Sequence, residues 1–184
     1  MLIKETPLPG VLLITPQSFG DSRGFFLEMY QRKRYTQAGL TMEFVQDNSS
    51  RSQKGTLRGI HFQNPHAQGK LVSVSRGRVF DVAVDLRQNS PTYRQWYGVE
   101  LDDEKHRQLW LPPGFGHGFY VLSDLADFSY KCTDYYHPES DCGIRWDDPD
   151  LGIQWPLAGK PLFSDKDFKL PFLRDIKSEQ LFYL

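Results

Sequence analysis

The chain has 184 residues, the length of one ordinary domain that can bury a substantial core without a disulfide framework or a structural metal. Its 22 lysines and arginines nearly balance its 23 aspartates and glutamates, and the formal net charge of −1 excludes a global field that would attract nucleic acid or a membrane surface. The N-terminal apolar run is broken by charges and prolines, and it is too short for a membrane span and unlike a secretory signal. Cys132 and Cys142 lack zinc-site spacing and suggest no disulfide framework. We therefore expect one domain over residues 1–184 in the reducing cytoplasm, with no nucleic-acid or membrane partner.

The first fifty residues predict short strands around one helix. Residues 11–15 form an apolar run typical of a strand, and the turn-forming sequence GDSRG at 20–24 precedes a second strand at 25–30. Residues 31–38 predict a short helix that the following glycine ends. Residues 44–52 alternate weakly, with polar side chains on both faces. That strand is either a wall that faces a ligand or an exposed edge strand.

The stretch from Gly55 to Lys70 combines a titratable base with an ammonium group. Residues 56–62 predict a strand, residues 63–69 contain a proline and a glycine and predict a turn, and another strand begins near Lys70. We expect the two strands to form a hairpin that brings His61 and Lys70 together near the connecting loop. His61 could then accept a proton near neutral pH, and Lys70 could stabilise developing negative charge. Taken singly, each residue is explained more simply, as a half-buried histidine and a solvated surface lysine.

Closely spaced strands are also predicted in the second half of the chain. In residues 79–87, VFDVAVDLR, the apolar side chains at alternate positions from Phe80 to Leu86 predict a sheet strand with one apolar side. Further strands are predicted at 96–101, 108–111, 118–122 and 128–133. About ten strands joined by short turns leave no room for crossover helices, so we expect an all-β fold, an antiparallel barrel or jelly roll with a few short helices. Residues 137–184 are rich in proline and aspartate and predict turns and short helices that cover the end of the barrel.

The sequence PPGFGHGF at 112–119 resembles the second short motif of the cupin superfamily, P-x-G-x-x-H. Metal-binding cupins usually supply H-x-H, then a glutamate, and then this later histidine. Here Gln63 takes the second position after His61, and Gln68 stands near the expected glutamate. Neutral amides bind divalent metals poorly compared with imidazole or carboxylate, so we expect neither a metal nor another cofactor. His117 is then either a hydrogen-bonding wall of the pocket or a core histidine with its hydrogen bonds satisfied.

A base beside an ammonium group suits metal-free removal of a proton from carbon next to a ketone. His61 would take the proton, and Lys70 would stabilise the enolate oxygen. Inversion of a stereocentre needs a proton donor on the opposite face, and Tyr130 is the candidate. Asp167 could orient the imidazole and raise its basicity. From the residues alone, Tyr130 could instead be a strand tyrosine anchored to backbone, and Asp167 one exposed aspartate among many.

Eight ordered segments resemble the dTDP-4-dehydrorhamnose 3,5-epimerase family over nearly the whole chain. They are GDSRGFF (20–26), FVQDN (44–48), LRGIHFQ (57–63), QGKLVSV (68–74), VFDVAVDLR (79–87), PPGFGHGF (112–119), YKCTDYY (130–136) and SDKDF (164–168). The resemblance implies a metal-free, cupin-type jelly-roll homodimer that converts dTDP-4-dehydro-6-deoxy-α-D-glucose to dTDP-4-dehydro-β-L-rhamnose in dTDP-L-rhamnose synthesis. It also implies that His61 is the proton acceptor, Asp167 its partner, Lys70 the enolate stabiliser and Tyr130 the proton donor.

The same resemblance implies where the dTDP-sugar is held. The implied substrate site contains Arg23 and Arg58 for the diphosphate, Glu28, Gln46 and Asn48 for thymidine, Tyr136 for stacking on thymine, His117 as a substrate contact, and at the nucleotide end Lys166 and Asp141, the latter where the family commonly has glutamate. Independently of the resemblance, Phe26 is an aromatic residue in polar surroundings that could add a stacking surface. The two arginines suit the diphosphate because guanidinium forks fit phosphate oxygens. In the family the first strands cross to the other subunit, so Arg23 and Glu28 would serve the neighbour's pocket.

One spacing conflicts with the implied site. Arg58 and His61 are three positions apart, and strict strand alternation would point them to opposite faces. Either a bulge intervenes or Arg58 reaches round the rim. Three alternatives for the activity are a dTDP-sugar epimerase that acts at a single position, C3 or C5, a metal-dependent cupin isomerase or oxygenase, and a non-catalytic sugar or nucleotide binder.

Overall fold

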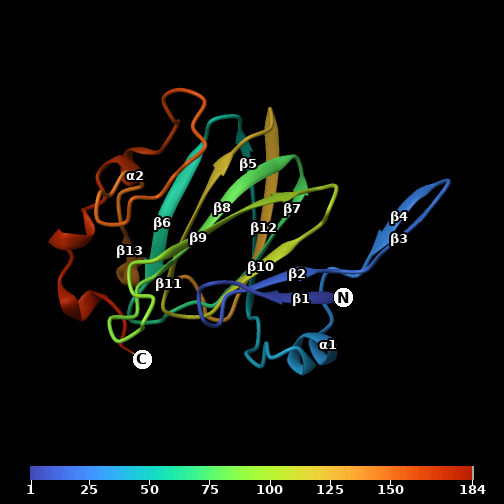
Figure 1. Cartoon of the computed structure of the whole chain (residues 1–184), viewed down its shortest axis with the longest axis horizontal. Helices are drawn as coiled ribbons and strands as arrows, with labels where there is room; N and C mark the ends of the chain where they lie inside the picture. Colours follow the sequence, from blue (N-terminus) through green and yellow to red (C-terminus); the bar gives the residue numbers. More distant parts are fainter. Residues whose placement is uncertain (184) are drawn as a thin grey trace.

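Strands from all parts of the chain assemble into two facing antiparallel sheets in the computed structural model, which describes residues 1–183 (Figure 1). The six-stranded sheet contains, in spatial order, β1 (Leu2–Glu5), β2 (Leu12–Thr15), β10 (Gln108–Leu111), β7 (Lys70–Arg76), β12 (Leu125–Cys132) and β5 (Gln46–Gln53). The five-stranded sheet contains β13 (Asp141–Gly143), β6 (Leu57–Gln63), β11 (Phe115–Val121), β8 (Arg78–Asp85) and β9 (Trp96–Asp102). Neighbouring strands within both sheets run antiparallel, which confirms the all-β fold class predicted from the sequence.

Apolar side chains from both sheets fill the space between them. Val72 and Phe128 point inward from the six-stranded sheet, and Val79 and Phe119 point inward from the five-stranded sheet. The rings of Phe119 and Phe128 stack with their centroids 4.2 Å apart. Full burial of each such side chain stabilises the fold by about 1.5–3 kcal/mol, so this core sets the separation of the two sheets.

Strand β8 is buried on both faces, whereas the sequence predicted a strand with one apolar side. Phe80, Val82 and Val84 lie on the outer face and belong to a second apolar cluster with Ile144 and Leu173 from the C-terminal part of the chain. The inner face carries small or polar residues as well as Val79, and these are buried too. The outer face is buried because the C-terminal segment covers it, and the alternation of residues within β8 does not reveal such a cover.

The predicted hairpin between residues 56–62 and the strand that begins at Lys70 is wrong. Strand β6 pairs with β11 and β13 in one sheet, whereas β7 pairs with β10 and β12 in the other. The six residues between the two strands cross from one sheet to the other. Facing sheets lie about 10 Å apart, a distance that six residues easily span. His61 and Lys70 therefore approach each other across the barrel, from opposite walls.

The N-terminal region contains the predicted helix and a ribbon that leaves the body of the molecule. Helix α1 (Arg32–Gln37) lies within the predicted range, and Gly39 follows it with a φ of +97°, as expected for a residue that ends a helix. Strands β3 (Ser18–Asp21) and β4 (Gly24–Leu27) pair only with each other, and Figure 1 shows them projecting to one side. Residues 20–24, predicted as a loop, form the tip of this ribbon.

The segment after residue 137 consists mainly of turns and short helices, as the sequence predicted. Its helical elements are η1 (Pro138–Ser140), α2 (Asp165–Phe168), η2 (Leu173–Asp175) and η3 (Ser178–Gln180). Leu173 of η2 and Leu181, which follows η3, pack on the outer face of the five-stranded sheet with Ile60 and Val82. Figure 1 shows α2 and the C-terminal part of the chain on this side of the sheet, whereas the sequence predicted that the segment covers the end of the barrel. No helix within residues 1–183 has both the length and the apolar character that a membrane crossing requires.

Candidate active site

A cavity of about 180 Å³ lies between the two sheets at one end of the barrel. Its lining residues are His61, Phe62 and Gln63 of β6, Gln68, Lys70 of β7, Tyr130 of β12, Tyr136, Asp141 of β13 and Lys166 of α2. Both walls of the barrel and the C-terminal segment thus contribute side chains. Six of the fourteen residues assigned to the site from the sequence are in this lining, and they include a base, a phenol and two amines.

His61 and Asp167 form a hydrogen-bonded pair at the edge of the cavity. The distance from His61 Nε2 to Asp167 Oδ1 is 2.6 Å, and the side chains are 31% and 5% exposed, respectively. Ser164, the N-cap of α2, donates its hydroxyl to Asp167 Oδ2 at 2.6 Å and so holds the carboxylate in place. Burial would raise the pKa of Asp167, but the hydrogen bonds from His61 and Ser164 outweigh it and the pKa lies below its usual value. With Nε2 donating to an ionised carboxylate, Nδ1 is the ring nitrogen that keeps a lone pair for a substrate proton.

Lys70 contributes an amine from the opposite wall. Its Nζ lies 6.0 Å from the centroid of the Tyr130 ring, and within residues 1–183 it has no hydrogen-bond or ion-pair partner. Burial lowers the pKa of Lys70, although the nearby Cys132, Asp141 and Asp81 act in the opposite direction. An amine without a protein partner in a confined site is free to bind a negatively charged oxygen of a ligand.

Tyr130 projects inward from β12, beside Lys70. Its ring packs against the main core and is tilted against Phe128, with 6.1 Å between the two centroids. Burial raises the pKa of the Tyr130 phenol, and the positive charge of Arg58 partly opposes this effect. The phenol therefore keeps its proton at neutral pH and can donate it.

A β-bulge resolves the conflict between Arg58 and His61. His117 of β11 pairs with His61, and two residues further on Phe119 pairs with Arg58, so β6 has one residue more than β11 over this interval. The extra residue is accommodated at Gly59, whose φ is +113° and where a Cβ atom would lie 2.6 Å from Gly118 Cα. Arg58 and His61 consequently share the inner face, and the Arg58 guanidinium reaches across the barrel to Ser52 Oγ at 3.2 Å. The bulge, one of two explanations considered from the sequence, is what the structure contains.

Tyr136, Asp141 and Lys166 form a polar cluster at the mouth of the cavity. The Tyr136 hydroxyl donates to Asp141 Oδ2 at 2.9 Å, and Lys166 Nζ forms an ion pair with the same oxygen. The backbone N–H of Tyr136 donates to Gln46 Oε1 at 2.9 Å. The hydrogen bond to Asp141 raises the pKa of the Tyr136 phenol. This cluster links β5, β13 and α2 around the opening.

Gln46 and Asn48 lie on the inward face of β5. The Gln46 amide donates to Asn48 Oδ1 at 3.1 Å, and Asn48 Nδ2 lies 3.6 Å from Cys132 Sγ on the paired strand. β5 is also the last strand of its sheet. The edge-strand interpretation of residues 44–52 is therefore confirmed, and the strand also turns a polar face toward the barrel interior. That this face binds a ligand stays a prediction.

His117 lies deeper in the barrel, paired with Asp81. The distance from His117 Nε2 to Asp81 Oδ2 is 2.9 Å, and both side chains are almost fully buried. The His117 ring stacks on Phe128 with 5.8 Å between centroids. Asp81 Oδ1 has no hydrogen-bond partner within the described chain. Sequence reasoning missed Asp81, although an aspartate inside an apolar strand is a signal that could have pointed to it.

Arg23, Phe26 and Glu28 are not brought to the cavity of their own chain. Arg23 and Phe26 lie on the β3–β4 ribbon, where Arg23 pairs with Asp21 at 2.6 Å and its side chain is 88% exposed. Glu28, just after the ribbon, pairs with Arg34 at 2.9 Å. The ribbon projects away from the two facing sheets (Figure 1).

The residues at the metal positions of cupins do not fit a divalent cation. The Gln63 amide nitrogen donates to two backbone carbonyls, those of His66 at 2.8 Å and Tyr135 at 3.1 Å, and the Gln68 amide donates to the carbonyl of Asp134 at 2.9 Å. The two amides thus hydrogen-bond to the backbone of the loops that follow β6 and β12. The sequence did not indicate this structural role. Amide oxygens of this kind are poor ligands beside imidazole and carboxylate.

Comparisons with known proteins give consistent results. A sequence model of the family described as dTDP-4-dehydrorhamnose 3,5-epimerase matches residues 5–175. The chain is 54% identical over 161 residues to the dTDP-4-dehydrorhamnose 3,5-epimerase of Pseudomonas aeruginosa, covering 87% of this chain and 89% of that protein. It is 51% identical over 173 residues to the protein of that name from Methanothermobacter thermautotrophicus, covering 93% and 94%.

The fold is similar to the crystal structure of dTDP-6-deoxy-D-glucose-3,5-epimerase from Legionella pneumophila in complex with dTDP-4-keto-L-rhamnose. The TM-score is 0.98 at 54% identity, and the alignment covers 100% of this chain and 98% of the other. This likeness confirms the predicted cupin-type jelly roll. The range matched by the family includes every residue that lines the cavity.

Proposed function

Because the chain belongs to the dTDP-4-dehydrorhamnose 3,5-epimerase family and is an epimerase of dTDP-rhamnose biosynthesis, we propose that His61 starts the reaction by removing protons from C3 and C5 of the 4-keto sugar. The observation that carries this proposal is the arrangement of three groups around one cavity. His61, backed by Asp167, faces Lys70 and Tyr130 on the opposite wall. A base, an oxyanion stabiliser and a proton donor are what inversion next to a ketone requires.

In this proposal two side chains and solvent carry the protons. His61 Nδ1 accepts the proton from carbon, and the ionised Asp167 stabilises the imidazolium that forms. The negative charge moves to the C4 oxygen, where the Lys70 ammonium donates to it. Tyr130 then donates its proton to the opposite face of the planar intermediate. The His61 imidazolium releases its proton to solvent and the Tyr130 phenolate takes one from solvent, so both groups return to their starting protonation states. Repetition at the second carbon gives the doubly inverted product.

Positive and aromatic groups around the mouth suit the nucleotide. In this proposal Arg58 binds the diphosphate, because its guanidinium is near enough to Tyr130 to lower the pKa of that phenol. Tyr136 stacks on thymine, and Asp141 and Lys166 fix the orientation of its phenol. Gln46 and Asn48 supply amides for thymidine from the polar face of β5.

We further infer that the chain forms a homodimer in which the β3–β4 ribbon serves the pocket of the other subunit. Phe19, Phe25 and Phe26 are 56%, 62% and 68% exposed on this ribbon, and such a concentration of exposed aromatic surface is typical of an interface. A groove of about 530 Å³ lies on the outer face of the six-stranded sheet, lined by Leu71, Ser73 and neighbouring residues. Arg23 would reach a diphosphate only from a partner subunit.

A cytoplasmic location completes the proposal, supported by the free thiols of Cys132 and Cys142.

The test of the chemistry is proton NMR of the enzyme with dTDP-4-dehydro-6-deoxyglucose in deuterated buffer. The wild type should lose the C3 and C5 proton signals, whereas His61→Asn should lose neither within the same time. His106→Asn removes an imidazole outside the cavity and serves as the matched control. Tyr130→Phe should retain exchange but form little inverted product. Exchange at wild-type rate in His61→Asn would overturn the assignment of the base, and loss of a single signal in the wild type would indicate an epimerase of one position.

Mixing variants tests the exchanged ribbon. Arg23→Ala and His61→Asn should each be nearly inactive, but a heterodimer would carry one pocket with both defects and one intact pocket. Random reassociation makes about half of the dimers mixed, so about a quarter of wild-type activity should return. No recovery after verified exchange of subunits would mean that Arg23 serves its own chain.

Turnover that is lost on chelation and restored only by iron or manganese would favour the metal-dependent alternative.

A further inference from the structure

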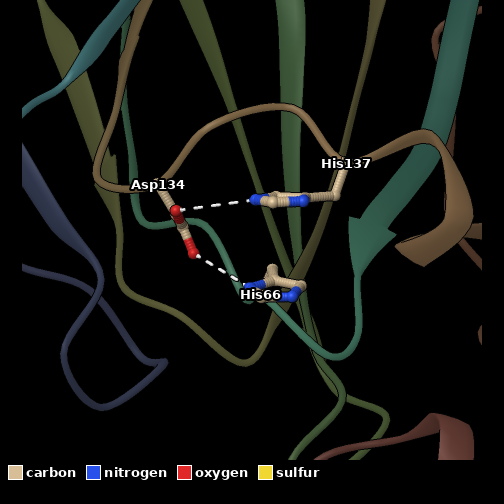
Figure 2. Close-up of side chains that lie close together, drawn as sticks. All are labelled: His66, Asp134 and His137. Carbon is tan, nitrogen blue, oxygen red and sulfur yellow. Dashed lines mark ion pairs between the residues drawn. The ribbon is translucent and has the colours of Figure 1, made fainter.

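Two histidines and one aspartate gather on the surface loops beside the active-site cavity (Figure 2). His66 lies in the loop between β6 and β7, and Asp134 and His137 lie between β12 and η1. One nitrogen from each imidazole and one carboxylate oxygen all lie within 4.8 Å of one another. None of the three residues takes part in the proposed epimerisation, so the cluster needs a separate explanation.

The two imidazole rings are aligned toward the same carboxylate. They stack with centroids 3.9 Å apart and planes 13° from parallel. His66 Nδ1 lies 3.7 Å from Asp134 Oδ2, and His137 Nε2 lies 4.0 Å from Asp134 Oδ1. Figure 2 shows both rings extending from their backbones toward Asp134. These distances are too long for hydrogen bonds, so the three groups surround a space rather than satisfying each other.

Hydrogen bonds to neighbouring side chains orient the cluster, as they orient the ligands of known metal sites. Glu139 Oε1 accepts from His137 Nδ1 at 3.2 Å, which leaves the lone pair on Nε2, the nitrogen that faces Asp134. Gln63, only 4% exposed, bonds the carbonyl of His66 and, through Tyr135, the strand-end loop that carries Asp134. The Gln63 amide, at a position where other cupins have a metal ligand, thus hydrogen-bonds to both loops.

We propose that His66, Asp134 and His137 bind a divalent transition-metal cation of the Zn²⁺ class. Two imidazoles and one carboxylate are a donor set that suits Zn²⁺, Co²⁺ and Ni²⁺ and disfavours Mg²⁺ and Ca²⁺. Tetrahedral ligands at about 2.0–2.1 Å from a metal are about 3.3 Å apart, and a metal lies near the plane of each imidazole that binds it. The two stacked rings must therefore rotate away from parallel as the three side chains close around the ion. The side chains can do so because they are 47%, 36% and 30% exposed. Water completes the coordination.

Metal binding would cross-link the two loops that flank the cavity. Gln68 and Tyr136 line the cavity and lie two residues from His66 and one residue from His137, respectively. The cation therefore stabilises the cavity wall but takes no part in proton transfer. It raises the thermal stability of the protein, by about 5 °C at a metal concentration of one hundred times Kd.

The test is a titration of chelator-treated full-length protein with Co²⁺, followed by visible absorption, with Zn²⁺ competition and melting curves in parallel. The wild type should bind one Co²⁺ per chain and show the intense bands of a tetrahedral site, which Zn²⁺ abolishes. His66→Asn and His137→Gln should each weaken Co²⁺ binding by at least about 100-fold. Loss of a residue that only hydrogen-bonds to a ligand costs about 10–100-fold, and loss of the ligand itself should cost more. Glu139→Ala should weaken it by about tenfold.

His106→Asn is the matched control. His66 and His106 both have a positive φ, 66° and 54°, which asparagine tolerates, so each substitution removes one imidazole at equal backbone cost. The control should bind Co²⁺ as the wild type does. Binding of unchanged strength in the His66→Asn, His137→Gln double variant, or no binding below 1 mM in the wild type, would overturn the proposal. Epimerase activity of the metal-free double variant tests the proposed reaction separately, and it should stay near the wild-type value.

Discussion

The barrel contains two histidine–aspartate pairs that differ mainly in their surroundings. His61 and Asp167 are 2.6 Å apart at the cavity, and His61 is 31% exposed. His117 and Asp81 are 2.9 Å apart in the interior, and their side chains are 9% and 0% exposed. His61 and His117 are directly paired neighbours on β6 and β11. A histidine–aspartate pair alone therefore does not identify a base, and of these two histidines only His61 lines the cavity.

The largest expected effect is on His61. His61→Asn should lower the rate of C3 and C5 deuterium exchange by about 10²–10⁴-fold, the range typical of a lost general base. The free energy of unfolding should fall by about 1 kcal/mol, because Asp167 loses the hydrogen bond from His61 but keeps the one from Ser164. Exchange by NMR and urea unfolding measure the two quantities. A large loss of stability with normal deuterium exchange would make His61 a structural residue. The His61 pair and the His117 pair would then not differ in function.

Lys70→Met tests the amine that lines the cavity, whose pKa burial lowers while the charge of the nearby Asp81 acts in the opposite direction. Loss of oxyanion stabilisation should lower kcat by about 10²–10³-fold. Burial holds the pKa of Lys70 below its usual value, so its charge costs stability at neutral pH, and this cost disappears as the pH rises through the folded-state pKa toward 10.5. The variant should therefore unfold at higher urea concentration than the wild type at pH 7. Lower stability at pH 7 would mean that the charge is compensated.

His117→Leu should act on stability before chemistry. It leaves the Asp81 carboxylate fully buried without its hydrogen-bond partner, which costs about 1–3 kcal/mol in the free energy of unfolding. Combining it with Asp81→Val should recover part of this loss, because the buried carboxyl group without a partner is gone. Urea unfolding of the four-member cycle measures the coupling. Normal stability with abolished turnover would instead give His117 the substrate contact that the family resemblance implies.

The smallest expected effect is the acid dependence of the Asp167 pair. The pKa of Asp167 is lower in the folded protein than its usual 3.8, so the carboxylate contributes stability that is fully present above 3.8 and lost as the pH falls through the folded-state value. Between pH 5 and the acid transition, the wild type should lose more unfolding free energy than Asp167→Asn. Parallel pH profiles of the two proteins would show that the hydrogen bonds from His61 and Ser164 add no net stability.

Several local features could be predicted from the residues, but pairings between distant strands could not. The helix at residues 31–38 and its ending at Gly39 were predicted because the signals lie within one turn. The hairpin from β6 to β7 was wrong because a six-residue connection suits either a hairpin or a crossing between sheets. The burial of the outer face of β8 also escaped prediction, since it depends on Leu173 and other residues far along the chain.

The sequence by itself determined the fold class and the chemical groups of the site. Strand periodicity is local, and the family segments preserve the base, the amine, the phenol and the acid in a recognisable order. Tertiary structure alone decided which groups meet. The bulge at Gly59 turns Arg58 to the face of His61, and burial separates the pair of His117 from that of His61. Exposure and partner choice depend on contacts between residues remote in the chain, and alternation along a single strand does not encode them.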